Sequence, residues 1–371
     1  MMRVCGEPPL FRTGYILDRR GDLIWFLGLP FLAILVAFAS QQWLTSMALV
    51  TIGLWITVPH HFASWLRTYG VPEERRVWKD RLYFGPAVIL GMCIVGFKFA
   101  PITTALLVLL WDHQHSIMQQ HGFARIYDFK GRTGAPSTGR FDLYLGWVLF
   151  CNMLVTSPLF MPVLVREFYR YGFPVTADAI HTVVMTSWTI TAGYGMLYLG
   201  HVAWSLRQGY AINPLKYVFI GCSYFLWYFC AWQVTNVLVF GIAHRIMHGV
   251  QYMVMVYWYL RRQTQSDHSE SRFAKTLVQP GFVGLFLLVS LLYALAFHLI
   301  SGGPIGGFVF GWVKFPTLYE AIPALGFAAM TAAEGYAFVA NAFIESFGLT
   351  HYYFDSFVWK VSDKRIQGGL E

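Results

Sequence analysis

The segment "TTALLVLLWDHQHSIMQQHGFARIYD", residues 103–128, joins an apolar run to a polar one with no turn residue between them. Its first part has the composition of a helix in lipid, whereas its second part carries Asp112, His113, His115 and His121. Titratable groups are costly in a low-dielectric environment unless they are paired or bind an ion. The segment therefore predicts a membrane helix that contributes to a functional site.

The composition of the chain agrees with a membrane protein. Of its 371 residues, 56% are hydrophobic and 12% charged, whereas soluble domains carry about 25% charged residues. A membrane-spanning helix needs about 20 apolar residues. We therefore expect an all-α, polytopic bundle of about ten transmembrane helices, in a single domain over residues 1–371. The expected spans lie near 23–40, 46–66, 82–99, 103–124, 143–165, 182–206, 216–235, 238–260, 280–300 and 325–350.

The basic residues predict the orientation of this bundle. They occur in short loops between apolar runs, which is typical of membrane orientation and argues against nucleic-acid binding. Ten spans place both termini on one side, and 22 of the 27 Lys and Arg residues fall on that side. We therefore expect both termini in the cytoplasm, with a cytoplasmic N-terminal segment (1–22) and tail (361–371), in a bacterial inner membrane.

The histidines follow the same topology. Nine of the 12 fall on the even-numbered spans, and eight of these lie in or near the predicted cytoplasmic half. Residues four apart share one face of a helix and can bind one ion together, as His244 and His248 would. We expect nine metal ligands: His60, His61, His113, His115, His121, His201, His244, His248 and His351. The other three histidines, His181, His268 and His298, are expected to have no special role.

Three carboxylates are candidates for catalytic roles because intramembrane carboxylates are usually functional. Asp112 lies three residues before His115 and is expected to orient its ring, as Asp355 is expected to orient His351. Glu334 lies on the segment that leads to His351. Within the opening segment, His113 and His121 are predicted to share the face that points to the metal. Tyr252 and Tyr257 are expected to be packing residues.

The histidine-bearing segments "HH", "HQHSIMQQH", "H", "HRIMH" and "HYYFD" resemble the membrane-bound histidine-cluster di-iron oxygenases, the superfamily of fatty-acid desaturases and hydroxylases. The order of histidines differs from the usual boxes of that superfamily. The dispersed single histidines also resemble the bacteriorhodopsin-related carotene dioxygenases. Sites built from imidazoles suit iron, copper or zinc, and nine histidines exceed the four ligands that one zinc takes, so we expect two metal ions or a metal with haem. The resemblances imply that the ions are iron, which would activate O2 and oxidise a hydrophobic, lipid-derived substrate by hydroxylation, desaturation or cleavage.

Two other classes of function remain open at this point. Facing histidines can bind haem, which would make the chain a membrane redox protein or an oxidase subunit. Buried titratable groups can also form the pathway of a metal or proton transporter. A monooxygenase or desaturase would need electrons, and we expect a soluble acidic donor to dock on the basic segments 67–81 and 125–140.

Overall fold

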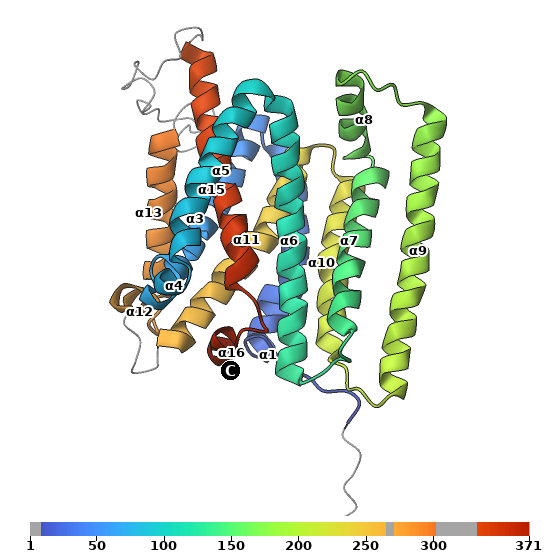
Figure 1. Cartoon of the computed structure of the whole chain (residues 1–371), viewed down its shortest axis with the longest axis vertical. Helices are drawn as coiled ribbons and strands as arrows, with labels where there is room; N and C mark the ends of the chain where they lie inside the picture. Colours follow the sequence, from blue (N-terminus) through green and yellow to red (C-terminus); the bar gives the residue numbers. More distant parts are fainter. Residues whose placement is uncertain (1–8, 265–270, 302–331, 371) are drawn as a thin grey trace, which may run out of the picture. The chain divides into compact units, whose positions relative to one another are not determined.

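The computed structural model describes residues 9–264, 271–301 and 332–370. Within these ranges the regular structure is helical and no strand is present, which confirms the expected all-α fold. The helices up to residue 131 are α1 (Arg19–Gly21), the π-helical η1 (Asp22–Gly28), α2 (Leu29–Trp43), α3 (Ser46–Thr68), α4 (Pro72–Val77), α5 (Lys79–Phe99) and α6 (Pro101–Gly131). They continue with α7 (Thr138–Thr156), α8 (Met161–Arg170), α9 (Ala177–Arg207), α10 (Pro214–Gln233), α11 (Val237–Thr264), α12 (Arg272–Leu277), α13 (Val283–Ser301), α15 (Ala332–Val358) and α16 (Lys364–Leu370) (Figure 1).

The expectation of about ten transmembrane helices is wrong for the part of the chain that the structure describes. Two helical stretches, Arg19–Trp43 and Lys79–Phe99, are long and apolar enough to cross a membrane, and a third is added if α7 and α8 count as one bent span. Most of the other long helices interrupt their apolar runs with polar groups, such as the histidines of α6. The expected span 325–350 lies partly outside the described residues.

The chain forms two compact units. Unit 1 contains α1, η1, α2 and α7 to α10, together with α6 from Ile117 and α11 up to Met247. Unit 2 contains α3, α4, α5, α12, α13, α15 and α16, together with α6 up to Ser116 and α11 from His248. The two long helices α6 and α11 thus contribute histidines to both units.

In unit 2 the core lies between α5 and α15, which run side by side (Figure 1). Ile89, Cys93 and Phe97 on α5 pack in one cluster with Ala342 and Leu349 on α15. Helix α3 packs against both α13 and α15. These contacts hold α3 and α15 together at the level where each carries a histidine.

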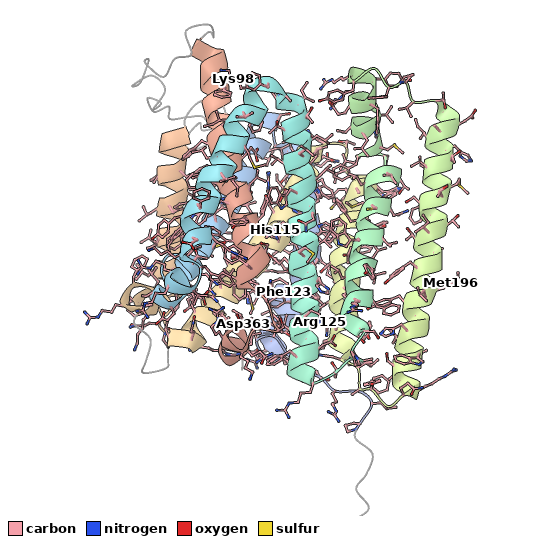
Figure 2. The ribbon with its side chains drawn as sticks, viewed as in Figure 1. Lys98, His115, Phe123, Arg125, Met196 and Asp363 are labelled. Atoms are coloured by element: carbon pink, nitrogen blue, oxygen red, sulfur yellow. The ribbon has the colours of Figure 1, made fainter. Side chains whose placement is uncertain are left out.

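In unit 1, α7 packs along α9, and α10 contacts both α7 and η1. Helix α9 is capped by Thr176, whose hydroxyl accepts a hydrogen bond from the backbone N–H of Ala179 at 3.2 Å. Its outward side is apolar, and Met196 is 70% exposed there (Figure 2). Unit 1 therefore presents a hydrophobic surface to its surroundings.

Candidate metal centre

Four helices of unit 2 bring histidines to one place. His60 and His61 come from α3, His115 from α6, His248 from α11 and His351 from α15. All five are buried, and Asp355, one helical turn after His351, lies 3.7 Å from His115 and 3.8 Å from His351. We refer to these five histidines and Asp355 as the histidine cluster.

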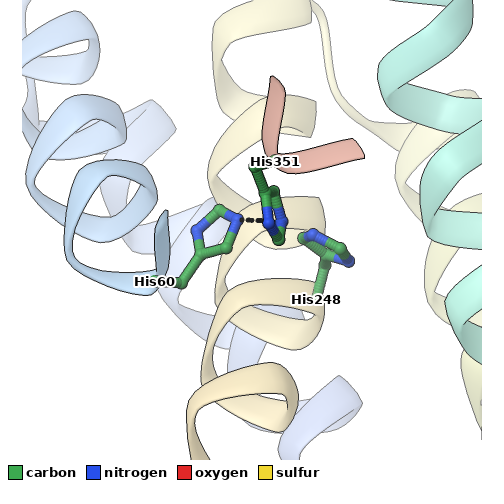
Figure 3. Close-up of side chains that lie close together, drawn as sticks. All are labelled: His60, His248 and His351. Atoms are coloured by element: carbon green, nitrogen blue, oxygen red, sulfur yellow. Dashed lines mark hydrogen bonds between the residues drawn. The ribbon is translucent and has the colours of Figure 1, made fainter. Parts of the chain in front are cut away.

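The first part of the cluster is a three-histidine group made by His60, His248 and His351 (Figure 3). One ring nitrogen of each lies within 4.8 Å of the others. The Nε2 atoms of His60 and His351 are 3.1 Å apart, and two adjacent ligands on one ion with bonds of about 2.1 Å are roughly 3.0–3.4 Å apart. Neutral rings can also share a hydrogen bond at this distance, but the third ring favours a common ion.

A glycine allows this approach. A Cβ atom at Gly249 would lie 3.2 Å from Nδ1 of His60, which is closer than side chains normally pack. Because Gly249 directly follows His248 in the chain, the backbone of α11 can lie against the His60 ring while His248 enters the same group. The small residue at this position therefore contributes directly to the geometry of the site.

The second part of the cluster is a mixed group made by His115, His351 and Asp355. Oδ2 of Asp355 lies 3.7 Å from Nε2 of His115 and 3.8 Å from Nδ1 of His351. Figure 2 shows His115 on α6, and its ring centroid is 4.9 Å from that of His248 and also 4.9 Å from that of His351. Two histidines and one carboxylate form the ligand set of many non-haem iron oxygenases.

A hydrogen-bond chain determines which nitrogen of His351 carries its proton. The hydroxyl of Tyr252 donates to Oδ1 of Asp355 at 2.7 Å. Because that proton is used, Ser64 must donate to the oxygen of Tyr252, 2.8 Å away. The oxygen of Ser64 is then left to accept a hydrogen bond from Nδ1–H of His351. His351 therefore presents the lone pair of Nε2 to the three-histidine group.

Further contacts stiffen this chain. The indole N–H of Trp359 donates to the oxygen of Tyr252 at 3.3 Å. The buried guanidinium of Arg67 lies over the ring of Trp359, 5.4 Å from its centroid, and forms an ion pair with Glu74 at 3.1 Å. The orientation of His351 is thus connected to a rigid, hydrogen-bonded support.

Burial keeps the site neutral in the absence of an ion. It holds the pKa of His60 and of His351 well below its ordinary value, and the charges that neighbouring imidazoles would carry act in the same direction. Burial likewise raises the pKa of Asp355 well above its usual range, while the hydrogen bond from Tyr252 lowers it. Neutral imidazole is the form of histidine that binds metals. The donor set therefore fits a transition-metal ion.

The other predicted site residues on α3 and α6 differ in how they contact the histidine cluster. His61 is close, with its ring centroid 5.2 Å from that of His351. His113 lies in unit 2, where its Nδ1–H donates to the carbonyl of Leu109 at 2.7 Å. Asp112 accepts a hydrogen bond from Tyr352 at 2.8 Å, and the ring of Tyr352 stacks on His115 at 4.4 Å. Asp112 thus acts on His115 through Tyr352.

Three predicted ligands lie in unit 1 and belong to neither group. His244 accepts a hydrogen bond from the indole N–H of Trp227 at 3.0 Å, and His201 stacks on Phe141 with ring centroids 3.9 Å apart. Burial lowers the pKa of His121 to about 4. The side chain of Glu334 lies outside the described residues.

The sequence interpretation missed Ser64 and Trp359 and assigned Tyr252 to packing. A signal for two of them was present, because Ser64 follows His60 by four residues and Tyr252 follows His248 by four. The same spacing relates Asp355 to His351, so each member of the three-histidine group has a polar residue one turn away on the same helical face.

No known protein family, characterised protein or solved structure matches this chain.

Proposed function

We propose that the chain is a membrane metalloenzyme that uses iron in the histidine cluster to activate O2 and oxidise a hydrophobic, lipid-derived substrate. The observation that carries the proposal is the pair of groups that share His351, one with three histidines and one with two histidines and a carboxylate. Each group offers three protein ligands, which leaves coordination positions for O2 or substrate. The spacing of the ring nitrogens favours bare ions over a porphyrin.

We propose two iron ions, one in each group. His60, His248 and Nε2 of His351 would hold the first, because the hydrogen-bond chain leaves that nitrogen with its lone pair. His115 and Asp355 would hold the second, with Nδ1 of His351 on the same side. Binding through Nδ1 requires its proton to leave, so the second ion should bind more weakly than the first. Iron supplies redox chemistry with O2, and the chain's own residues orient the ligands and carry the proton.

The substrate class follows from the surroundings of the site. The candidate membrane-spanning helix α5 belongs to unit 2 and packs along α15, the helix that carries His351 and Asp355. Exposed apolar side chains on α5, such as Phe84 and Met92, suit contact with lipid. A lipid-derived molecule could therefore reach unit 2 without passing through water.

A reductant is needed if the reaction is a hydroxylation or desaturation, and we propose an acidic, soluble, one-electron donor. The segment 67–81 exposes Arg75, Arg76, Lys79 and Arg81. Within that segment Trp78 donates a hydrogen bond to Glu74, the partner of Arg67. Contacts continue from Arg67 through Trp359 and Tyr252 to His351. Reduction of bound iron by such a donor should become slower as the ionic strength rises, because salt screens the docking charges.

Nitric oxide tests the proposal because it binds open sites on non-haem Fe(II) in the place of O2. Full-length protein loaded with one Fe(II) per chain, which should fill the tighter three-histidine group, should give the S = 3/2 electron paramagnetic resonance signal of an iron–nitrosyl, and His351→Ala should abolish it. His244→Ala, from the other unit, is the matched control and should retain the signal. If iron binds stoichiometrically but gives no nitrosyl signal, the cluster is a metal site, and the proposal that it activates O2 is wrong.

A further inference from the structure

Unit 1 exposes four aromatic rings that are close together in sequence, on α8 and the turn that follows it. Phe168, Tyr169, Tyr171 and Phe173 are 54%, 56%, 55% and 63% exposed. Large aromatic side chains are usually mostly buried, and a group that remains exposed marks an interaction surface. The hydroxyl of Tyr169 donates to the carbonyl of Val175 at 3.0 Å, so the turn is an ordered part of this surface.

The carboxylate of α8 and the aromatic rings beside it are arranged in the opposite sense to those of a helix in water. The carboxylate of Glu167 is buried, and Arg166 and Arg170 reach back to it at 3.4 Å and 3.1 Å. Its neighbours Phe168 and Tyr169 point outward. A helix on a water-exposed surface would turn its carboxylate outward and its rings inward. The medium outside α8 must therefore favour aromatic rings over a carboxylate.

The connection to α7 places this surface at the end of a candidate span. Helix α7 ends at Thr156 because Ser157 precedes Pro158 and leaves the helical conformation, with ψ at 146°. Helix α8 then departs at 69°, and α7 and α8 together are long and apolar enough to cross a membrane. The 19 residues of α7 extend about 28 Å, close to the roughly 30 Å of a bilayer core. Counted with α7 as one span, the 10 residues of α8 add only about 5 Å along the direction of α7, because their length of about 15 Å is tilted by 69°. Helix α8 therefore lies at the end of the span and runs close to the membrane surface.

The charges agree with such a location. The side chains of Arg166 and Arg170 are 60% and 45% exposed, and they share a single buried carboxylate. The surface therefore has net positive charge next to its aromatic rings. Aromatic side chains concentrate at the boundary between acyl chains and headgroups, and arginines beside them bind lipid phosphates.

We propose that α8 and the turn through Phe173 form an interfacial anchor that binds the headgroup region of an anionic bilayer. The four rings lie at the depth of the lipid glycerols, and Arg166 and Arg170 contact lipid phosphates. The break at Ser157–Pro158 directs α8 along the membrane plane. This role is independent of the metal centre and of the reaction proposed for it.

Photocrosslinking to lipid tests the anchor in the full-length protein. The photoreactive residue p-benzoyl-phenylalanine would replace Phe168 or Phe173 in protein reconstituted into vesicles of phosphatidylcholine with phosphatidylglycerol. Met92, 62% exposed on the candidate span α5, is the positive control. Phe240, buried against Phe160, is the negative control. We expect lipid adducts at Phe168 and Phe173 in yields comparable with that at Met92, and none at Phe240.

The arginines provide a second readout. The double variant Arg166→Gln/Arg170→Gln should lower the adduct yield several-fold in anionic vesicles and much less in phosphatidylcholine alone, because the phosphate of that lipid is balanced by its choline and only the anionic lipid adds a net electrostatic attraction. Absence of lipid adducts at Phe168 and Phe173, with normal adducts at Met92, would overturn the proposal. Crosslinks to a second copy of the chain in place of lipid would also overturn it and identify an interface between subunits.

Discussion

Both units bury titratable groups, but they do so in different ways. In unit 1, Lys216 contacts Asp128 at 3.0 Å and Asp142 at 3.1 Å, and Arg125 contacts the same two carboxylates at 2.7 Å and 3.1 Å. Two cations and two anions make this ion network neutral, and Tyr198 donates a further hydrogen bond to Asp142. Every charge in it is compensated by a side chain of the opposite sign.

In unit 2 the histidine cluster gathers groups of one kind. It holds five imidazoles and one carboxylate, and protonation of two adjacent rings, such as His60 and His351, would place like charges at close range. Arg67, the buried cation that contacts the cluster through Trp359 and Tyr252, forms an ion pair with Glu74. The ion network is therefore complete as a structural element, whereas the histidine cluster holds the neutral donors that the metal centre proposed above requires.

The largest effect is expected from a pair of substitutions on one helix. His248 belongs to the three-histidine group, and His244, four residues earlier on α11, belongs to unit 1. His248→Ala should remove the bound metal, because it deletes one of three ligands, whereas His244→Ala should leave the metal content per folded chain unchanged. Elemental analysis of the two purified variants checks this. An equal loss of metal in both variants would contradict the assignment of the metal site to unit 2 alone.

Breaking the ion network of unit 1 should lower the stability of the protein without changing its metal content. Lys216→Met leaves two buried carboxylates with Arg125 alone, and breaking a buried ion pair in this way costs about 3–5 kcal/mol. Thermal unfolding in detergent should show the loss, with normal metal content below the transition. Adding Asp142→Asn should restore part of the stability, since it removes the excess negative charge. A variant that loses its metal without losing stability would contradict the structural role.

A smaller effect is expected where a side chain supports a ligand without binding the ion. Tyr252→Phe removes the hydroxyl that connects Ser64 to Asp355, and loss of such a support typically lowers metal affinity about 10–100-fold. Tyr257→Phe is the matched control on α11, since Tyr257 bonds only the carbonyl of Gln279 among the hydrogen bonds described for it. Competition with a chelator of known affinity measures both variants. An unchanged metal affinity in Tyr252→Phe would show that the hydrogen-bond chain does not support metal binding.

The smallest effect concerns pH. Because the folded-state pKa of His60 and of His351 is lowered, the unfolded chain takes up their protons as pH falls below about 6.5 while the folded chain does not. Asp355, with its raised pKa, acts in the opposite direction. The metal-free protein should therefore lose stability as pH falls from about 6.5 to 5, because each buried neutral histidine, His121 included, contributes up to about 1.4 kcal/mol per pH unit and Asp355 offsets about one of them. The double variant His60→Gln/His351→Gln should flatten the dependence of stability on pH. If the dependence stays unchanged in this variant, other titratable groups cause it.

The sequence predicts the helical class and the site's histidines better than it predicts their grouping. His60, His248 and His351 were identifiable because histidines in apolar helices need a reason to be there. Periodicity shows which residues share a face of one helix, but not which helices meet, so His201 and His244 could not be separated from the members of the histidine cluster. The residues Ser64 and Tyr252 could have been found from their spacing of four to His60 and His248.

The number of spans was overestimated for a related reason. The length of the apolar runs led us to expect α6 and α11 to be spans, although polar residues interrupt both. The same criterion joined α7 and α8 into one span across Pro158. Length and mean composition do not distinguish a helix that packs inside a protein from one that faces lipid. That distinction depends on tertiary contacts, as Glu167 and Phe168 on α8 show.

X-ray absorption at the iron edge counts the imidazole ligands on the bound ion and so reports on the proposed metal centre itself. Full-length protein loaded with Fe(II) should show a first shell of nitrogen and oxygen with the outer-shell scattering of two or three imidazoles per iron. In His60→Ala/His351→Ala the bound iron and this scattering should both disappear, and they should persist in His201→Ala/His244→Ala. Wild-type iron content with unchanged imidazole scattering in the first double variant would contradict a metal centre in unit 2.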